Sequence, residues 1–346
     1  MILENTGNDI IKSVGQLLAK KGNNIVVVPH ENSDGDAIGS AIGFAEVLQN
    51  SGQNVSIVSP NNYPSFLKWF SSEIEILIYE NRKKSAEEKI QAADLLFCLD
   101  FNEVKRAGKL GKQLSEFSKP KILIDHHPLP SLFCDYTISE PAYSSTAELI
   151  FDVVTQLDLG SFMNYNAAEA LYTGILTDTG SFSHSMSRAN VFNVVSELLK
   201  YGINTNKIQS NVYHNFSAER MKLLGYCLNE KMEVFAESRA AVISLSKEEQ
   251  VKYNFQIGDS EGFVNYPLSI TNTVFSALFI ERDGLVKASF RSKGSFPVNE
   301  FSRNHFNGNG HLNAAGGESN ESLDKTLEKF RQLLVQYKYQ LINTKI

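Results

Sequence analysis

Short apolar runs alternate with amphipathic segments through the first half of the chain. The apolar runs occupy residues 24–28, 54–59, 93–100 and 121–125 and are rich in Val, Ile and Leu. Apolar positions three or four residues apart, the spacing of an amphipathic helix, recur in residues 9–20, 36–52, 144–159 and 167–182. Short strands alternating with helices are typical of an α/β fold with a parallel sheet covered on both faces.

The pattern changes after about residue 185. Residues 189–230 have the spacing of successive helices, and residues 276–292 predict a β-hairpin that turns at Asp283-Gly284. Residues 307–311 (NGNGH) predict a glycine-rich turn, and residues 321–341 predict a terminal helix. We therefore expect an N-terminal α/β domain over 1–185, a helical linker over 186–230 and a smaller α/β domain over 231–346.

Composition and charge narrow the functional classes. The chain has 346 residues, 42% of them hydrophobic, and a net charge of −6, which argues against a protein that coats long nucleic acid but allows a nucleotide ligand. Its three cysteines (Cys98, Cys134 and Cys227) are scattered and do not form a disulfide framework. The N-terminal segment lacks the pattern of a signal peptide, and no apolar run is long enough to cross a membrane. These features predict a soluble, cytoplasmic protein.

Acidic and imidazole side chains cluster where the predicted strands end. They are His30, Asp34 and Asp36 after the first strand, Asp100 at the end of another, and Asp125, His126 and His127 at the end of a third. Each aspartate alone has an ordinary explanation as a turn residue or helix N-cap. Together they favour a metal site, because turns do not need imidazole and the carboxyl ends of parallel strands meet at one edge of a sheet.

Asp178 adds a further candidate ligand. The stretch 167–182 predicts a helix that ends near Thr177, so the Asp178 carboxylate would face the negative end of the helix dipole. That placement costs about 0.3–1 kcal/mol. A nearby cation would remove the cost, although a solvated aspartate at a helix end remains the alternative.

The donor set indicates the kind of metal. Oxygen and imidazole donors without cysteine suit Mn²⁺ or Mg²⁺ better than structural zinc. The ligands are too many for one ion that must keep water positions open, and they suit two ions about 3.5–4 Å apart with a hydroxide between them. Such a centre is suited to hydrolysing phosphate esters.

Five motifs, in order, resemble the DHH phosphoesterase superfamily. They are DGDAIGS (34–40), LDFNEVKR (99–106), DHH (125–127), TDTG (177–180) and GNGHLNAAGG (308–317), the last belonging to the DHH-associated C-terminal domain. Together they look like the branch of nanoRNases (oligoribonucleases) that are also 3′-phosphoadenosine-5′-phosphate phosphatases. The resemblance implies a DHH domain joined by the helical linker to a DHH-associated domain.

The resemblance also implies roles for individual residues. One ion would be held by His30, Asp34 and Asp100, and the other by Asp36, Asp100, His126 and Asp178, with Asp100 as the bridge. Asp125 would orient its neighbours, and His127 would be a catalytic residue that points to the substrate phosphate. The substrate would also be bound by Arg291 and by Gly308, Gly310 and His311 of the glycine-rich turn. Mn²⁺ is the expected ion, with Mg²⁺ and Co²⁺ as alternatives.

The second domain shows one departure from the family pattern. Asn309 stands where the family usually has glycine, and we expect the turn to survive because Asn tolerates positive φ. Its side chain would alter which substrates fit. Arg291 belongs to a local basic patch with Lys287, Lys293 and Arg303, and its guanidinium fork matches phosphate geometry better than a lysine does. Acids on one domain and bases on the other predict a cleft that closes on substrate.

The leading hypothesis is therefore a two-metal phosphohydrolase acting on short single-stranded oligoribonucleotides such as nanoRNA and dinucleotides, and on a mononucleotide bisphosphate, 3′-phosphoadenosine 5′-phosphate. Long duplex nucleic acid and membranes are not expected partners, and a homodimer is an open alternative. Two other functions stay open: a pyrophosphatase or exopolyphosphatase, and a catalytically inactive nucleotide-binding sensor.

Overall fold

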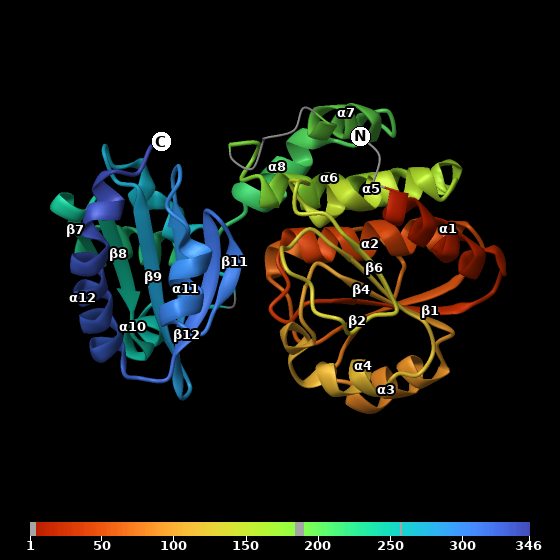
Figure 1. Ribbon diagram of the computed structural model, residues 1–346, viewed down its shortest axis with the longest axis horizontal. Coiled ribbons are helices and arrows are strands. Elements are labelled where there is room, and N and C mark those ends of the chain that lie inside the picture. The colour runs from red at the N-terminus through yellow and green to blue at the C-terminus, as the bar shows by residue number, and fades with distance from the viewer. Residues whose placement is uncertain (1–4, 184–189, 257) are drawn as a thin grey trace. The chain divides into compact units, whose positions relative to one another are not determined.

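The computed structural model describes residues 5–183, 190–256 and 258–346. It contains two compact units, unit 1 over Met1–Asn215 and unit 2 over Phe216–Ile346 (Figure 1). Each unit is built around its own six-stranded sheet.

The sheet of unit 1 is parallel throughout. Its strands lie in the order β3-β2-β1-β4-β5-β6. The strands are β1 (Asn24–Pro29), β2 (Asn54–Ser59), β3 (Ile76–Ile78), β4 (Leu95–Leu99), β5 (Lys121–Asp125) and β6 (Tyr136–Ser139). The order of strands along the chain reverses between β1 and β4, which is where open α/β sheets bind their ligands.

Helices cover both faces of this sheet (Figure 1). One face carries α1 (Asn5–Ala19), α2 (Gly35–Asn50), α5 (Thr146–Gln156) and α6 (Tyr165–Asp178), which share the larger apolar core with alternate strand residues. The other face carries α3 (Lys83–Ala92), the 3₁₀ segment η2 (Val104–Leu110) and α4 (Gly111–Glu116), which enclose a second core. Because the strands are buried on both sides, they are continuous apolar runs rather than alternating ones.

Unit 2 has a mixed sheet in the order β11-β12-β10-β9-β8-β7. The strands are β7 (Met232–Phe235), β8 (Ala240–Leu245), β9 (Phe275–Arg282), β10 (Leu285–Ser292), β11 (Asn309–His311) and β12 (Ala314–Ser319), and only β8 and β9 pair in parallel. As predicted, β9 and β10 form a hairpin that turns at Asp283-Gly284, with Gly284 at φ +79°.

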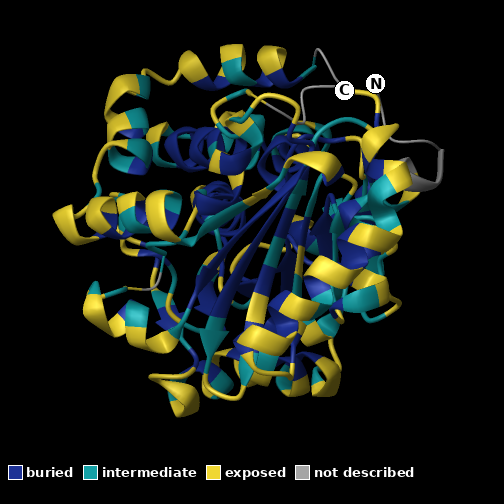
Figure 2. Cartoon of the chain, turned by 90° about the vertical axis from the view of Figure 1, so that its left-hand side faces the viewer, coloured by how far each residue is buried: buried dark blue, intermediate teal, exposed yellow. Residues whose placement is uncertain are grey.

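The helices of unit 2 also cover its sheet. The phenylalanine-rich core beneath α11 (Val298–His305) and α12 (Leu323–Ile342) fills one face. On the other face, α9 (Ala218–Tyr226) and η6 (Phe263–Ser269) pack against β8 and β9, and α10 (Lys247–Lys252) follows β8. Figure 2 shows strands that are largely buried and helices whose outer turns are exposed.

The segment expected as a linker is shared between the two units. Helices α7 (Asn190–Leu199) and α8 (Thr205–Tyr213) belong to unit 1, where Val191 and Ile208 join its large core. Helix α9 belongs to unit 2. The expected boundary at residues 185 and 186 lies outside the described residues.

The predicted glycine-rich turn differs in detail from the structure. Asn307, at φ +48°, makes the turn, and Asn309–His311 form the short edge strand β11. A Cβ atom on Gly308 would lie 2.0 Å from the Gly316 carbonyl oxygen, so glycine is required for the close approach of two chain segments. Within the described part of the chain, the helices are too short or too polar to span a membrane.

Candidate metal centre

Three neighbouring strands of unit 1 deliver polar side chains to one edge of the sheet. His30 follows β1, Asp100 follows β4, and Asp125 is the last residue of β5. The strands are parallel neighbours, so their carboxyl ends meet beside the point where the strand order reverses. The six candidate ligands lie there in two groups, His30 with Asp34 and Asp100, and Asp36 with His126 and Asp178.

In the first group, the ring of His30 is oriented by the backbone. Its Nδ1 lies 2.8 Å from the Glu31 carbonyl oxygen, which requires the hydrogen to be on Nδ1. Its Nε2 is buried and has no hydrogen-bond partner among the described residues. That nitrogen lies 3.8 Å from Asp34 Oδ2 and 3.6 Å from Asp100 Oδ2, too far for hydrogen bonds. A buried, unpaired nitrogen between two carboxylates fits a cation.

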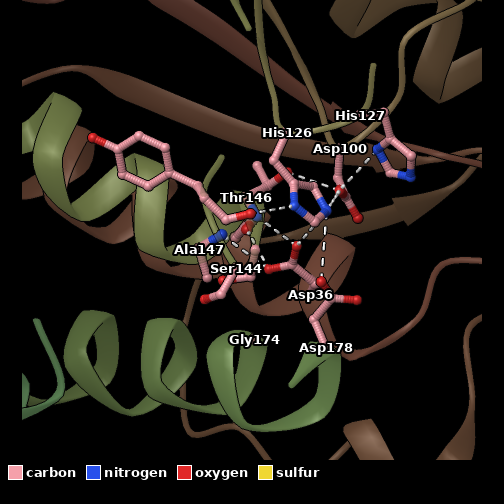
Figure 3. A network of polar contacts seen from close by, with 12 residues as sticks. Asp36, Asp100, His126, His127, Ser144, Thr146, Ala147, Gly174 and Asp178 are labelled. Atoms are coloured by element: carbon pink, nitrogen blue, oxygen red, sulfur yellow. Dashed lines mark hydrogen bonds and ion pairs between the residues drawn. The ribbon is translucent and has the colours of Figure 1, made fainter. Parts of the chain in front are cut away.

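The second group has the same design (Figure 3). His126 Nδ1 lies 3.2 Å from the Tyr143 carbonyl oxygen, so its Nε2 faces the acids. Nε2 is 3.9 Å from Asp36 Oδ2, 3.7 Å from Asp100 Oδ1 and 3.6 Å from Asp178 Oδ2. A backbone acceptor on the far nitrogen is the usual way in which a metal-binding histidine is oriented.

Asp100 lies between the two groups. Its Oδ2 faces His30 and its Oδ1 faces His126, and Oδ1 also accepts a 2.8 Å hydrogen bond from Thr146 Oγ1. Its backbone has φ +66°, a left-handed conformation that aspartate tolerates better than most residues. The two carboxylate oxygens of one residue therefore face both ligand groups.

Asp36 is held by the beginning of helix α5. Its carboxylate accepts hydrogen bonds from the Thr146 amide (2.7 Å), the Ala147 amide (2.9 Å) and the Ser40 hydroxyl (3.2 Å). These two amides belong to the first turn of α5, where the helix dipole favours an anion.

Ser145 and Glu148 have the Ser-x-x-Glu spacing of a capping box, and this box is half formed. Ser145 caps the helix by accepting from the Glu148 amide, but the Glu148 carboxylate accepts from the Ser144 amide rather than from the Ser145 amide. The Ser-x-x-Glu spacing marks the start of α5, because Ser145 is its N-cap. It did not reveal that the same helix end also binds Asp36.

Electrostatics differ between the buried carboxyls. Burial raises the pKa of Asp36 well above its usual range, and the charges of Asp100 and Asp178 raise it further. Burial also opposes ionisation of Asp100, but His30, His126 and Arg106 outweigh it and hold the pKa of Asp100 below its usual value. Burial, and next the charge of Asp100, raise the pKa of Asp125 to about 7. Several acids buried together create a strong demand for positive charge.

Asp125 and His127 form a pair beside the ligands. His127 Nδ1 lies 2.7 Å from Asp125 Oδ1, while His127 Nε2 lies 3.0 Å from Nη1 of Arg106. The sequence left two alternatives for Arg106, a cap of the next helix or a contact with the substrate. Its position six residues after Asp100, within the LDFNEVKR motif, was the available signal.

Asp178 is placed by close packing of α2 against α6. A Cβ atom on Gly39 of α2 would lie 2.5 Å from the Ala170 carbonyl oxygen of α6, and one on Gly174 of α6 would lie 2.6 Å from the Ala147 Cβ of α5. The glycines therefore let α6 approach both α2 and α5 closely. As predicted, Asp178 is the last residue of α6, and its carboxylate faces the ligand group rather than solvent alone.

In unit 2, Arg291 and His311 lie on one face of the sheet. Arg291 of β10 and His311 of β11 each pair directly with Ala314 of β12, and directly paired residues point to the same side. Asn309 lies two residues from His311 on that side and accepts a 3.1 Å hydrogen bond from Arg303. Asn309 adopts a strand conformation, so the expected need for positive φ at this position was wrong; Gly310, at φ +151°, takes the unusual conformation.

Two family models match the chain over most of its length. The N-terminal domain of the DHH family matches residues 24–175, and the DHHA1 domain matches residues 240–337. A crystal structure of an exopolyphosphatase-related protein from Bacteroides fragilis is 40% identical, covers 97% of this chain and 98% of its own, and superposes with a TM-score of 0.90. The chain belongs to the DHH family.

Two further relatives align with more than four-fifths of this chain. The bifunctional oligoribonuclease and PAP phosphatase NrnA of Thermus thermophilus is 26% identical over 95% of this chain and 96% of its own. The protein of the same name from Bacillus subtilis is 24% identical over 84% of this chain and 88% of its own. The resemblance read from the five motifs is thus confirmed, and so is the α/β fold with a second mixed-sheet domain.

The donor chemistry of this DHH family member suits hard divalent ions. Carboxylate oxygens and imidazole nitrogens make up both groups, and the buried, unpaired His30 Nε2 is directed between two acids. None of the three cysteines, all of them free thiols, belongs to either group. The residues present therefore fit two such ions, with oxygen and nitrogen ligands typical of Mn²⁺ or Mg²⁺.

Proposed function

We propose that this chain is a two-metal phosphohydrolase that cleaves short oligoribonucleotides and removes a phosphate from 3′-phosphoadenosine 5′-phosphate. Two observations support the substrate class. Relatives that align with more than four-fifths of the chain are named for these two activities, and the chain carries both the DHH and the DHHA1 domains.

The observation that carries the proposal is the orientation of Asp100. Its two oxygens face His30 and His126, and these histidines belong to separate groups of candidate ligands. A carboxylate shared in this way is what a dinuclear site requires. A structural ion pair would need only one partner.

On this proposal, His30, Asp34 and Asp100 hold one ion, and Asp36, Asp100, His126 and Asp178 hold the other. Mn²⁺ is the ion we propose, because imidazole and carboxylate donors are mixed in each group. Two bound divalent ions would supply Lewis-acid activation of water and neutralise charge on the phosphoryl group.

The chain's own residues would orient the ligands and the substrate. The Glu31 and Tyr143 carbonyl groups fix the rings of His30 and His126, and the first turn of α5 fixes Asp36. His127 would lie beside the reacting phosphate. We propose that Arg291 and His311, with the turn at Gly308 and Gly310, bind a second phosphate of the substrate, since a guanidinium fork suits phosphate oxygens.

A substrate panel tests the proposal. We would incubate the protein in Mn²⁺ buffer with a diribonucleotide, 3′-phosphoadenosine 5′-phosphate, pyrophosphate and polyphosphate, and measure the mononucleotide or phosphate released. Polyphosphate is included because the Bacteroides fragilis relative is called exopolyphosphatase-related. The first two should be hydrolysed and the last two should not. Release only from pyrophosphate or polyphosphate would replace the proposed substrate class, and release from none would favour a nucleotide-binding sensor.

A further inference from the structure

Arg106 brings a fixed positive charge to the candidate metal centre. Its backbone is anchored on both sides: its amide donates to the Glu103 carbonyl oxygen at 3.0 Å, and its carbonyl oxygen accepts from the Glu31 amide at 2.6 Å. Because Glu31 directly follows His30, this anchoring ties the loop after β4 to the end of β1. The side chain of Arg106 therefore starts from a defined position beside the ligands.

The guanidinium of Arg106 determines which nitrogen of His127 carries hydrogen. Arg106 Nη1 lies 3.0 Å from His127 Nε2 and 3.5 Å from the Asp100 carbonyl oxygen. Arginine stays protonated in proteins and has only donors, so His127 Nε2 must accept. The hydrogen of the neutral ring is then on Nδ1, which donates to Asp125 Oδ1 at 2.7 Å.

This chain of hydrogen bonds changes the role expected of His127. With its Nε2 lone pair occupied by Arg106, His127 cannot donate a proton to a substrate from that nitrogen. The charged donor at this position is the guanidinium itself. Both hydrogen bonds of the Arg106 side chain within the described residues come from Nη1, so Nη2 and Nε keep their hydrogens for another acceptor.

We propose that Arg106 binds the phosphate of the substrate at the metal centre, and that Asp125 and His127 hold its guanidinium in position. A planar guanidinium with several donors is well matched to phosphate oxygens. The surrounding acids Asp34, Asp100 and Asp178 would otherwise repel the substrate anion. The identity of the natural substrate rests on the proposed function, but the binding of a phosphate group at Arg106 can be measured separately.

The test compares phosphate binding by four proteins. They are the wild type, Arg106→Ala, Arg106→Lys and the control Lys105→Ala. Lys105 is the neighbouring cation, is exposed, and pairs with Glu103 at 2.7 Å. Isothermal titration calorimetry would measure the affinity of each protein for Mn²⁺ and then, in Mn²⁺, its affinity for inorganic phosphate. Melting temperatures would report folding.

We expect Arg106→Ala to bind inorganic phosphate about ten- to a hundredfold more weakly while its Mn²⁺ affinity and melting temperature stay close to the wild type. Arg106→Lys should lose less, because it keeps the charge but not the fork. Low concentrations of guanidinium chloride should restore part of the phosphate affinity of Arg106→Ala and should not affect Lys105→Ala. If the wild type hydrolyses a diribonucleotide, KM should rise more than kcat falls.

Two results would overturn the inference. Phosphate affinity of Arg106→Ala within about twofold of the wild type would mean that Arg106 does not bind the anion. A parallel loss of Mn²⁺ affinity and melting temperature in both Arg106 variants, without rescue by guanidinium, would assign Arg106 to holding the ligands in place. Failure of the wild type to bind Mn²⁺ or to cleave RNA would contradict the proposed function instead, and that failure is visible before any variant is compared.

Discussion

At the scale of single residues, Asp100 combines an unusual backbone with a central position. Its φ of +66° turns the chain sharply after β4, and its two carboxylate oxygens face His30 and His126.

The structure brings all six candidate ligands together, and their role as ligands stays a prediction. Thr146 was not predicted, and Arg106 was left between a helix cap and a substrate contact, because Arg and Thr are common in loops and a single sequence does not show which of them point inward.

We predict that Asp100→Asn folds normally and loses activity. Asparagine tolerates positive φ and can still accept from Thr146 Oγ1, but it removes the charge shared by the two ligand groups. Loss of several kcal/mol of charge stabilisation corresponds to a fall in kcat of about a hundredfold or more. Diribonucleotide hydrolysis measures the fall. The matched control is Asp94→Asn, at the opposite end of β4. Near-native turnover by Asp100→Asn would rule out the bridging role of Asp100.

Asp178 offers a second prediction, because its carboxylate lies at the unfavourable end of α6. We expect Asp178→Asn to weaken Mn²⁺ binding without lowering the melting temperature of the metal-free protein. Removing a repulsion with the helix dipole of about 0.3–1 kcal/mol should leave that temperature unchanged or slightly raised. Calorimetric Mn²⁺ titration and thermal unfolding in a chelator measure the two effects. A marked drop in metal-free stability would show that Asp178 has a structural role.

At the scale of elements, the strands and helices around the site were predictable, and their close packing was not. Apolar periodicity located β1, β4, β5 and α6 to within a few residues, because burial of whole faces dominates the pattern. The sequence predicted a turn where the structure has the short edge strand β11. Glycine is common both in turns and where two backbone segments approach closely, so the glycines did not distinguish the two. The helical segment after residue 189 gave no sign of how it divides between the units.

The contact between α2 and α6 gives a prediction for Gly39→Ala. The added Cβ would lie 2.5 Å from the Ala170 carbonyl oxygen, so the two helices must separate. We expect a loss of about 1–3 kcal/mol in the free energy of unfolding and weaker Mn²⁺ binding, because Asp36 and Asp178 belong to these helices. Thermal unfolding measures the loss of stability, and calorimetric titration measures the change in Mn²⁺ affinity. In the control, Gly225→Ala in α9, the Cβ meets open space, and stability should not fall. Equal effects of the two changes would contradict the packing explanation.

Unit 2 has a carboxylate whose ionisation should stabilise the fold. Glu249 accepts from Lys231 Nζ at 2.8 Å, from the Ser246 amide at 2.7 Å and from Tyr226 Oη at 2.6 Å. Partial burial opposes ionisation of Glu249, but these donors outweigh it and lower its pKa from 4.5 to about 2. The stabilisation is therefore complete above pH 4.5 and is lost as the pH falls toward 2.

Glu249→Gln should consequently be destabilising near neutral pH and much less so near pH 3. Hydrogen bonds to a charged group contribute about 1.5–3 kcal/mol, which sets the upper range of the loss. Melting temperatures of the wild type and the variant between pH 7 and pH 3 measure the difference. A difference that stays constant over this range would show that the charge of Glu249 contributes nothing.

At the scale of the whole molecule, charge favours short substrates. The net charge is −6, so a long polyanion gains little binding energy from the protein surface beyond the site itself.

The family, the α/β fold and the presence of a second mixed-sheet domain were all predictable, because they depend on ordered motifs and on burial patterns that span many residues. By contrast, the sequence could not show that Arg291 and His311 both pair with Ala314, because this pairing depends on the register between strands β10, β11 and β12.

We predict faster hydrolysis of RNA of two to five residues than of a long strand, with weak dependence on salt. A substrate held through about two phosphates should lose only about tenfold in affinity between roughly 50 and 200 mM salt. Initial rates on labelled RNAs of increasing length, at several salt concentrations, measure both properties. Equal rates on short and long RNA with a steep salt dependence would indicate an extended binding surface instead.

The number of Mn²⁺ ions bound per chain tests the central claim most directly. Calorimetric titration of the metal-free wild type should give two ions per chain, and Asp36→Asn should weaken one of them while His30→Ala weakens the other, since these residues belong to separate ligand groups. Asp100→Asn should weaken both. A single Mn²⁺ per chain, or two ions whose binding is unchanged in Asp100→Asn, would contradict a dinuclear centre bridged by Asp100.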